Sequence, residues 1–160
     1  EAEAQGFQVI VDYAFEPVAM AALYKVAEQL KPNRVIHVLG AAGGGRDRSR
    51  RPVLGRFVAE RAAIVIVTNE DPYDDEPMGI IEEVARGAEE CRIKNEECRM
   101  VELVKILNRR EAIGKALALA QAGDLVLITG KGSEQGMVVK GKIVPWDDRR
   151  VVRDEIKNLK

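Results

Sequence analysis

The feature that most constrains this chain is a fivefold alternation of short β-branched apolar runs with segments of helical periodicity. The expected strands span residues 8–13, 34–40, 63–68, 101–107 and 124–129. Five strand-then-helix units with short connections require parallel pairing and right-handed crossovers. We therefore predict an α/β fold, a doubly wound, mostly parallel, Rossmann-like sheet of about six strands with helices on both faces.

Capping residues suggest where the helices begin and end. Pro17 suits a first helical turn, and Asn108, followed by a glutamate three residues later, is an N-cap signal. Gly123 is expected to close that helix, and Asp147 to begin the last one. Segment 91–100 either extends the third helix or leads into the fourth strand. The expected helices span residues 18–30, 52–62, 78–90, 108–122 and 147–159, and a C-terminal hairpin pairs 137–139 with 142–144.

At 160 residues the chain is long enough for one domain with its own core. Residues 1–4, Glu-Ala-Glu-Ala, resemble the remnant of a secretion leader used in expression, so the domain is expected to span 5–160. No apolar run reaches the length of a membrane span and no signal peptide is present, which predicts a soluble, cytoplasmic protein. We expect a monomer.

Charge and metal-ligand counts exclude two further classes. The 25 basic and 26 acidic residues nearly cancel, which argues against a nucleic-acid-binding protein held by bulk charge. Cys91 and Cys98 are the only cysteines and His37 the only histidine, so a zinc cluster would lack ligands. The two cysteines are expected to be free thiols.

Polar loops follow four of the expected strands, and one of them carries four arginines within residues 46–51. Because the carboxyl ends of parallel strands meet at one edge of a sheet, we expect these loops to converge there on a ligand. Glycines in the sequence GAAGGG at residues 40–45 would let backbone N–H groups approach an anion, and guanidinium groups can grip a carboxylate or phosphate. The four loops span residues 12–16, 43–51, 69–75 and 130–134.

Common nucleotide-binding motifs are weak or missing. The glycines at residues 40–45 depart from the dinucleotide pattern G-x-G-x-x-G and follow the second strand rather than the first. A nicotinamide oxidoreductase is therefore the least favoured class. No G-x-x-x-x-G-K-[ST] sequence occurs, so the chain alone is not expected to hold and split ATP.

Structural interpretations compete with functional ones at several positions. The arginine run can be interpreted as the solvated start of a helix. Positive charge at a helix N-terminus is unfavourable, however, unless an anion or Asp47 offsets it, which favours an anion site. Asp12, at a strand end, either caps the next turn or contacts a ligand. His37, inside a strand, and Trp146, beside the hairpin, are interpreted as structural residues.

Five motifs occur in order along nearly the whole chain: VDYAFEP at 11–17, GGGRDRSRRP at 43–52, TNEDPY at 68–73, NRREAI at 108–113 and GKGSE at 130–134. They are similar to V-D-Y-A-H-x-P, G-G-D-R-D-x-x-K-R-P, T-S-D-N-P-R, D-R-x-x-A-I and G-K-G-H-E. In this order and spacing they resemble the C-terminal domain of the Mur ligases, and within that family the UDP-N-acetylmuramoyl-tripeptide synthetases.

The resemblance implies an ATP-dependent ligase. In that family a carboxylate of UDP-N-acetylmuramoyl dipeptide is phosphorylated, and the amine of an incoming amino acid attacks the acyl phosphate. ATP and Mg²⁺ are handled by a central P-loop domain, so this lobe alone is expected to bind no cofactor or metal and to contribute no catalytic residue. Its expected partners are the N-terminal and central ligase domains. By resemblance, Asp12 contacts the nucleotide ribose, Arg46 holds the amino acid's carboxylate, and Gly130 and Glu134 read its distal end.

Departures from the family motifs bear on the substrate. Asp71 and Tyr73 replace the asparagine and arginine of the D-N-P-R signature that accompanies meso-diaminopimelate. Losing that arginine removes a grip on a distal carboxylate, so these substrate-binding positions favour an amino acid with a distal amine, such as lysine. Phe15 and Ser133 replace histidines, which leaves open a second class, a non-catalytic binding or scaffold module that retains the ligase-lobe fold.

Overall fold

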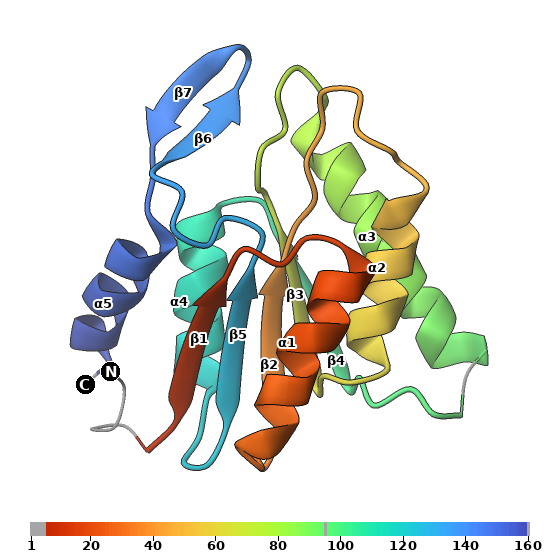
Figure 1. Ribbon diagram of the computed structural model, residues 1–160, viewed down its shortest axis with the longest axis vertical. Coiled ribbons are helices and arrows are strands. Elements are labelled where there is room, and N and C mark those ends of the chain that lie inside the picture. The colour runs from red at the N-terminus through yellow and green to blue at the C-terminus, as the bar shows by residue number, and fades with distance from the viewer. Residues whose placement is uncertain (1–5, 95, 160) are drawn as a thin grey trace.

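The computed structural model describes residues 6–94 and 96–159, in which strands and helices alternate (Figure 1). The expected leader remnant at residues 1–4 lies outside the described residues. No helix of these two ranges is long and apolar enough to cross a membrane. The strands are β1 (Gln8–Asp12), β2 (Val35–Leu39), β3 (Ile64–Thr68), β4 (Glu102–Ile106), β5 (Leu125–Thr129), β6 (Gly136–Val139) and β7 (Lys142–Pro145). The helices are α1 (Pro17–Gln29), α2 (Arg50–Ala59), α3 (Pro77–Lys94), α4 (Arg109–Leu119) and α5 (Asp148–Asn158).

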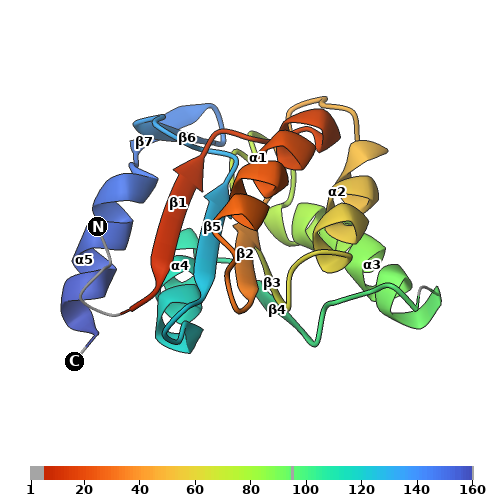
Figure 2. The same ribbon diagram turned by 60° about the horizontal axis from the view of Figure 1, so that its bottom comes forward.

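The first five strands form one parallel sheet in the order β1-β5-β2-β3-β4 (Figure 2). The hairpin strands β6 and β7 pair antiparallel in a separate two-stranded sheet. Each neighbouring pair in the main sheet is parallel, as short strand–helix–strand connections require. The predicted doubly wound fold is confirmed, with five strands in the main sheet and the hairpin standing apart from it.

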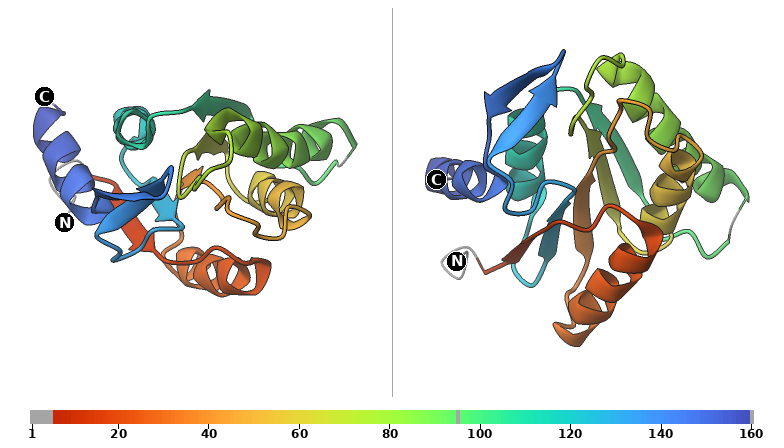
Figure 3. Two further views of the ribbon diagram at one scale, coloured as in Figure 1. Left: turned by 90° about the horizontal axis from the view of Figure 1, so that it is seen from above. Right: turned by 45° about the horizontal axis from the view of Figure 1, so that its top comes forward.

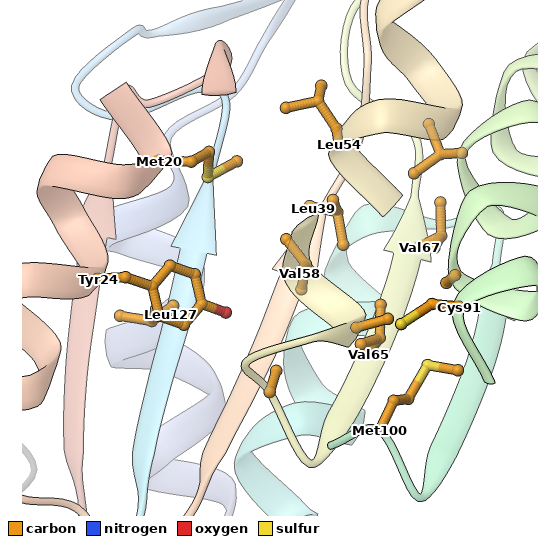
Figure 4. Packing of buried hydrophobic residues seen from close by; sticks show 14 of the residues in the cluster. Met20, Tyr24, Leu39, Leu54, Val58, Val65, Val67, Cys91, Met100 and Leu127 are labelled. Atoms are coloured by element: carbon orange, nitrogen blue, oxygen red, sulfur yellow. The ribbon is translucent and has the colours of Figure 1, made fainter. Parts of the chain in front are cut away.

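Different helices cover the two faces of the sheet (Figure 3). Helices α1, α2 and α3 pack on one face, over core residues that include Leu39, Val65 and Leu127 (Figure 4). Helices α4 and α5 pack on the other face, against residues such as Ile66 and Ile128. Successive residues of the central strands therefore enter different cores, which explains why β3 and β5 are apolar up to their last residue.

Helix α4 is shorter than predicted, because it ends at Leu119 rather than continuing to the turn at Gly123. Arg34 Nη2 donates to the Leu119 carbonyl oxygen at 2.8 Å, so a side chain from the loop before β2 satisfies one of the free carbonyl groups at the helix end. Gly123 lies instead in the turn before β5, where its N–H donates to the carbonyl of Gly6. The sequence alone does not reveal this long-range cap.

The predicted N-caps are confirmed. Asn108 Oδ1 accepts hydrogen bonds from the backbone N–H groups of the second and third residues of its helix, at 2.9 and 3.2 Å. Asp147 Oδ1 accepts one from the N–H of Arg149 at 2.9 Å. The segment whose assignment was open is divided, because residues 91–94 extend α3 and residues 96–101 lead into β4.

His37 is fully buried in β2, in agreement with its structural interpretation. Its Nδ1 lies 2.8 Å from the Tyr24 hydroxyl, and its Nε2 lies 2.9 Å from Thr129 Oγ1. Burial lowers the pKa of His37 to about 3, so the ring is neutral near pH 7. Its two ring nitrogens join α1, β2 and β5 across the core.

A buried ion pair lies beneath the carboxyl edge of the sheet. Arg109 Nε and Nη2 donate to Asp148 Oδ1 and Oδ2 at 2.9 and 2.7 Å, and neither side chain is exposed. Arg109 also donates to the carbonyl oxygens of Asn69 and Thr129 at 3.1 and 2.9 Å. Trp146 Nε1 donates to Asp148 at 2.7 Å, as expected of a structural residue. One guanidinium thus fixes the ends of β3 and β5 to the starts of α4 and α5.

Replacing Arg109 by methionine is expected to lower the free energy of unfolding by about 3–5 kcal/mol, because the buried Asp148 carboxylate loses its counter-ion. The adjacent Arg110 is half-exposed and pairs with Glu155 at 2.7 Å. Its replacement by methionine is expected to cost about 1 kcal/mol or less. Urea unfolding of R109M and R110M measures both values, and similar losses in the two variants would contradict the role of the buried pair.

Candidate functional site

Four loops meet at the carboxyl edge of the parallel sheet and enclose a cavity of about 360 Å³. They follow β1, β2, β3 and β5, and the β6–β7 hairpin stands at the same end of the sheet (Figure 1). The convergence expected from the topology is therefore observed, and the volume suits a small ligand. The lining residues are Tyr13, Phe15, Glu16, Ala41, Ala42, Arg46, Asp47, Arg50, Arg51, Leu54, Glu70, Asp71, Tyr73, Gly130 and Glu134.

The structure brings together the residues predicted to bind the amino acid, because Arg46, Asp71, Tyr73, Gly130 and Glu134 all line this one cavity. They come from three loops that are far apart in the sequence. Their proximity is observed, whereas their contact with a ligand stays a prediction.

Asp12, predicted to contact the nucleotide, is not among the lining residues. It ends β1 at the same edge of the sheet, and its Oδ1 accepts a hydrogen bond from the Ala14 N–H at 2.7 Å. The turn-capping interpretation of this carboxylate is therefore observed. Its contact with a nucleotide stays a prediction.

Three of the four arginines in the 46–51 run are neutralised by carboxylates of the protein. Arg48 and Arg51 both donate to Glu83 of α3, Arg51 at 2.8 Å, and the Arg51 side chain is buried. Arg50 donates to Glu16 at 2.6 Å. The charge of this run was expected to be offset by an anion or Asp47, and in the structure Glu16 and Glu83 offset much of it.

Arg46 differs from the rest of the run. Its side chain is exposed at the cavity and makes no ion pair or hydrogen bond with the described residues. A guanidinium without an internal partner can form paired N–H bonds to a carboxylate or phosphate. The anion site predicted for the run is thus reduced to this one residue.

Sequence reasoning did not assign a role to Lys131. Its ammonium lies 2.9 and 2.8 Å from the two carboxylate oxygens of Asp71 and 2.7 Å from Glu134 Oε2, and its side chain is 1% exposed. Burial lowers the pKa of Lys131, but the hydrogen bonds to Asp71 and Glu134 outweigh burial, so its pKa is raised. The two acidic residues predicted to face a substrate therefore already have a cation.

Glu70 is a second residue that sequence reasoning missed. It lines the cavity, is 5% exposed, and its Oε2 has no hydrogen-bond partner among the described residues. Burial raises its pKa to about 7, although Arg109 and Lys131 oppose the shift. A buried carboxyl with an unpaired oxygen at a cavity is typical of a functional group. The available signal was an acidic residue two positions after a buried strand.

Two glycines make room for side chains at the cavity. Gly130 has φ 103°, and a Cβ there would collide with Glu70 Oε2. Gly44 has φ 65°, and a Cβ there would lie 2.7 Å from Tyr73 Cγ. Gly130 therefore contributes to the site through its missing side chain, which leaves space beside the unpaired oxygen.

The charged groups that line the cavity can bind a small ligand. Within residues 6–94 and 96–159, no group of three or more His, Cys, Asp or Glu is placed to hold a metal ion. The cavity offers the unpaired guanidinium of Arg46 and the free carboxyl oxygen of Glu70. A guanidinium suits a carboxylate and a carboxylate suits an ammonium, so the arrangement suits a small zwitterion.

The fold and the cavity define a doubly wound α/β domain with a small-ligand site at the carboxyl edge of its sheet. A family model described as "Mur ligase, glutamate ligase domain" matches residues 1–132. The chain belongs to the Mur ligase family and corresponds to its C-terminal domain. The predicted family resemblance is confirmed.

Named relatives agree with this family. The chain is 39% identical over 150 residues to a UDP-N-acetylmuramoyl-L-alanyl-D-glutamate--2,6-diaminopimelate ligase of Syntrophomonas wolfei, covering 94% of this chain and 29% of the relative. It is 36% identical over 155 residues to a UDP-N-acetylmuramyl-tripeptide synthetase of Borreliella burgdorferi, covering 97% and 29%.

A solved structure of a UDP-N-acetylmuramoyl-L-alanyl-D-glutamate--2,6-diaminopimelate ligase has a TM-score of 0.79 and 33% identity, over 96% of this chain and 30% of that one. This similarity agrees with the fold described above. The chain spans less than a third of the length of these relatives.

Two buried groups give opposite contributions to the pH dependence of stability. The pKa of Glu70 is raised from 4.5 to about 7, so its stabilising contribution is present below pH 4.5 and is lost as the pH rises to about 7. The pKa of His37 is lowered from 6.5 to about 3, so its contribution is present above pH 6.5 and is lost as the pH falls towards 3.

Replacing Glu70 by glutamine removes the first contribution. The unfolding free energy of E70Q minus that of the wild type is expected to rise by about 1.4 kcal/mol per pH unit between pH 4.5 and 7. The same difference for H37N is expected to fall as the pH rises from 3 to 6.5. Urea unfolding at a series of pH values measures both, and a pH-independent difference for E70Q would show that Glu70 titrates normally.

Proposed function

We propose that this chain is the amino-acid-binding lobe of an ATP-dependent ligase that adds the third residue to UDP-N-acetylmuramoyl dipeptide in peptidoglycan precursor synthesis. The observation that carries the proposal is the cavity in which the unpaired guanidinium of Arg46 and the free carboxyl oxygen of Glu70 line one space. The names of the Syntrophomonas wolfei and Borreliella burgdorferi relatives support the same reaction class.

The charges in the cavity favour an incoming amino acid with a distal amine. Arg46 suits its α-carboxylate, and Glu70 suits an ammonium at its far end. Asp71, expected from the sequence to face that amine, already pairs with Lys131, so Glu70 takes the role instead. Tyr73 supplies no guanidinium for a distal carboxylate. The substrate we propose is therefore lysine-like rather than meso-diaminopimelate, although the Syntrophomonas wolfei relative is named for the latter.

In this proposal ATP and Mg²⁺ are held by the remaining domains of the ligase. No G-x-x-x-x-G-K-[ST] sequence occurs in the chain. When bound, ATP supplies the phosphoryl group that activates the dipeptide carboxylate. The lobe contributes by holding the amine within reach of that activated group, and such orientation can lower a barrier by about 7–11 kcal/mol in well-oriented cases. Asp12 uses Oδ1 as a turn cap, which leaves its other oxygen for a ribose hydroxyl.

A non-catalytic binding or scaffold module is the second candidate. It is favoured by Phe15 and Ser133, which stand where the family motifs have histidines. Phosphate release from ATP, measured with UDP-N-acetylmuramoyl dipeptide and lysine, separates the two candidates. We expect release by the full-length protein that contains this chain and none by the chain alone. A full-length protein without amino-acid-dependent release would favour the module.

In the full-length ligase, Arg46→Lys is expected to lower kcat/KM for the amino acid about 10- to 100-fold, because an ammonium cannot form the paired bonds of a guanidinium to a carboxylate. Arg48→Lys is the matched control, since Arg48 pairs with Glu83 and does not line the cavity. Its kcat/KM is expected to stay within about threefold of the wild type. Steady-state kinetics measure both, and equal losses would remove Arg46 from the proposed site.

A further inference from the structure

Two acidic side chains meet at the ammonium group of Lys131, and one of them also bonds to β6. Asp71 belongs to the loop after β3, Glu134 to the loop after β5, and Val138 to β6. Lys131 Nζ lies 2.9 and 2.8 Å from the Asp71 oxygens and 2.7 Å from Glu134 Oε2. Asp71 Oδ1 also accepts the Val138 N–H at 2.7 Å. One buried cation therefore links both loops, and through Asp71 it reaches the hairpin.

Backbone hydrogen bonds continue this link along β6. The Tyr73 N–H donates to the Val138 carbonyl at 3.1 Å, and the Lys140 N–H donates to the Tyr73 carbonyl at 2.8 Å. Tyr73 and Val139 form a parallel bridge. Tyr73 has φ 52°, a conformation that residues other than glycine adopt only when their surroundings hold them there. The bonds between Tyr73 and residues 138–140 hold this conformation, and the contact between Lys131 and Asp71 lies next to them.

The acidic side chains nearest to Lys131 differ in whether they have a cation. Asp71 and Glu134 share the Lys131 ammonium, whereas Glu70 Oε2 has no hydrogen-bond partner among the described residues. Lys131 itself is not among the residues that line the cavity. It can therefore shape the charge of the cavity without touching a ligand.

We propose that Lys131 is a positioning residue that pairs with both Asp71 and Glu134 and clamps the loop after β3 to the β6–β7 hairpin, so that Glu70 is left to receive the substrate ammonium. The role of Glu70 in binding the substrate ammonium rests on the proposed function, whereas the clamp does not. In this proposal the hairpin also influences the site, because a shift of the hairpin would move Asp71 and Tyr73 through their hydrogen bonds to Val138 and Lys140.

Methionine at position 131 separates this role from simple packing, because it keeps a flexible apolar side chain of similar length and removes the ammonium. K25M is the matched control, since Lys25 is an exposed lysine of α1 that does not line the cavity. Both variants are made in this chain, and amide hydrogen exchange is followed by NMR. The amides that report are those of Tyr73, Val138 and Lys140, with the Val65 amide of β3 as an internal reference.

In K131M the exchange protection of the Tyr73, Val138 and Lys140 amides is expected to fall by about tenfold or more relative to Val65. The pKa of Glu70 is expected to rise above its wild-type value of about 7, because Lys131 lowers it and two neighbouring carboxylates lose their counter-ion. K25M is expected to change neither. Unchanged protection of the three amides in K131M would overturn the proposal, whatever the titration of Glu70 shows.

If K131M does not fold, the same hydrogen-exchange measurement is made on K131R, which keeps the positive charge. The retained charge is expected to keep the three amides protected, and their loss of protection in a folded K131R would overturn the clamp. In the full-length ligase, K131M is expected to raise KM for lysine about tenfold or more while KM for ATP stays within about threefold. A wild-type ligase that uses another amino acid but not lysine would refute the proposed substrate, and the hydrogen-exchange result would still decide on the clamp.

Discussion

The candidate site depends on the buried ion pair between Arg109 and Asp148, which holds the carboxyl ends of β3 and β5 in place. Two charges without exposure are tolerated only when their hydrogen bonds are satisfied, and the guanidinium meets this demand through one carboxylate and two backbone carbonyls. The carbonyls belong to Asn69 and Thr129, the residues directly before Glu70 and Gly130. The pair therefore fixes the two peptide groups that lead directly into the lining residues Glu70 and Gly130.

The charge of the cavity is determined by ion pairs within the protein. Most basic and acidic side chains at the edge already have partners within the protein, as Arg51 does in Glu83 and Asp71 in Lys131. The Arg46 guanidinium and Glu70 Oε2, which have no partner among the described residues, remain for a ligand. A cavity that is rich in charge by composition thus becomes selective, because an unpaired group contributes to binding while a paired one must first lose its partner.

The sequence was sufficient for the features that depend on local pattern or on topology. The β-branched runs, the caps at Asn108 and Asp147, and the meeting of four loops at one edge were all predictable in this way. The state of each charged residue was not, because it depends on partners far along the chain. Arg51 and Glu83 are 32 positions apart, and Lys131 and Asp71 are 60 apart. Local pattern cannot show which member of an arginine run or an acidic loop is left free.

We propose that the cavity selects an amino acid whose far end carries an ammonium and no carboxylate. Isothermal titration calorimetry of the full-length ligase tests it most directly, with L-lysine and meso-diaminopimelate titrated separately in the presence of UDP-N-acetylmuramoyl dipeptide and a non-hydrolysable ATP analogue. Lysine is expected to bind more tightly by about tenfold or more, since the cation near the distal end, Lys131, is already paired with Asp71 and Glu134 and a second carboxylate would lack a free one. Equal affinities, or tighter binding of meso-diaminopimelate, would contradict it.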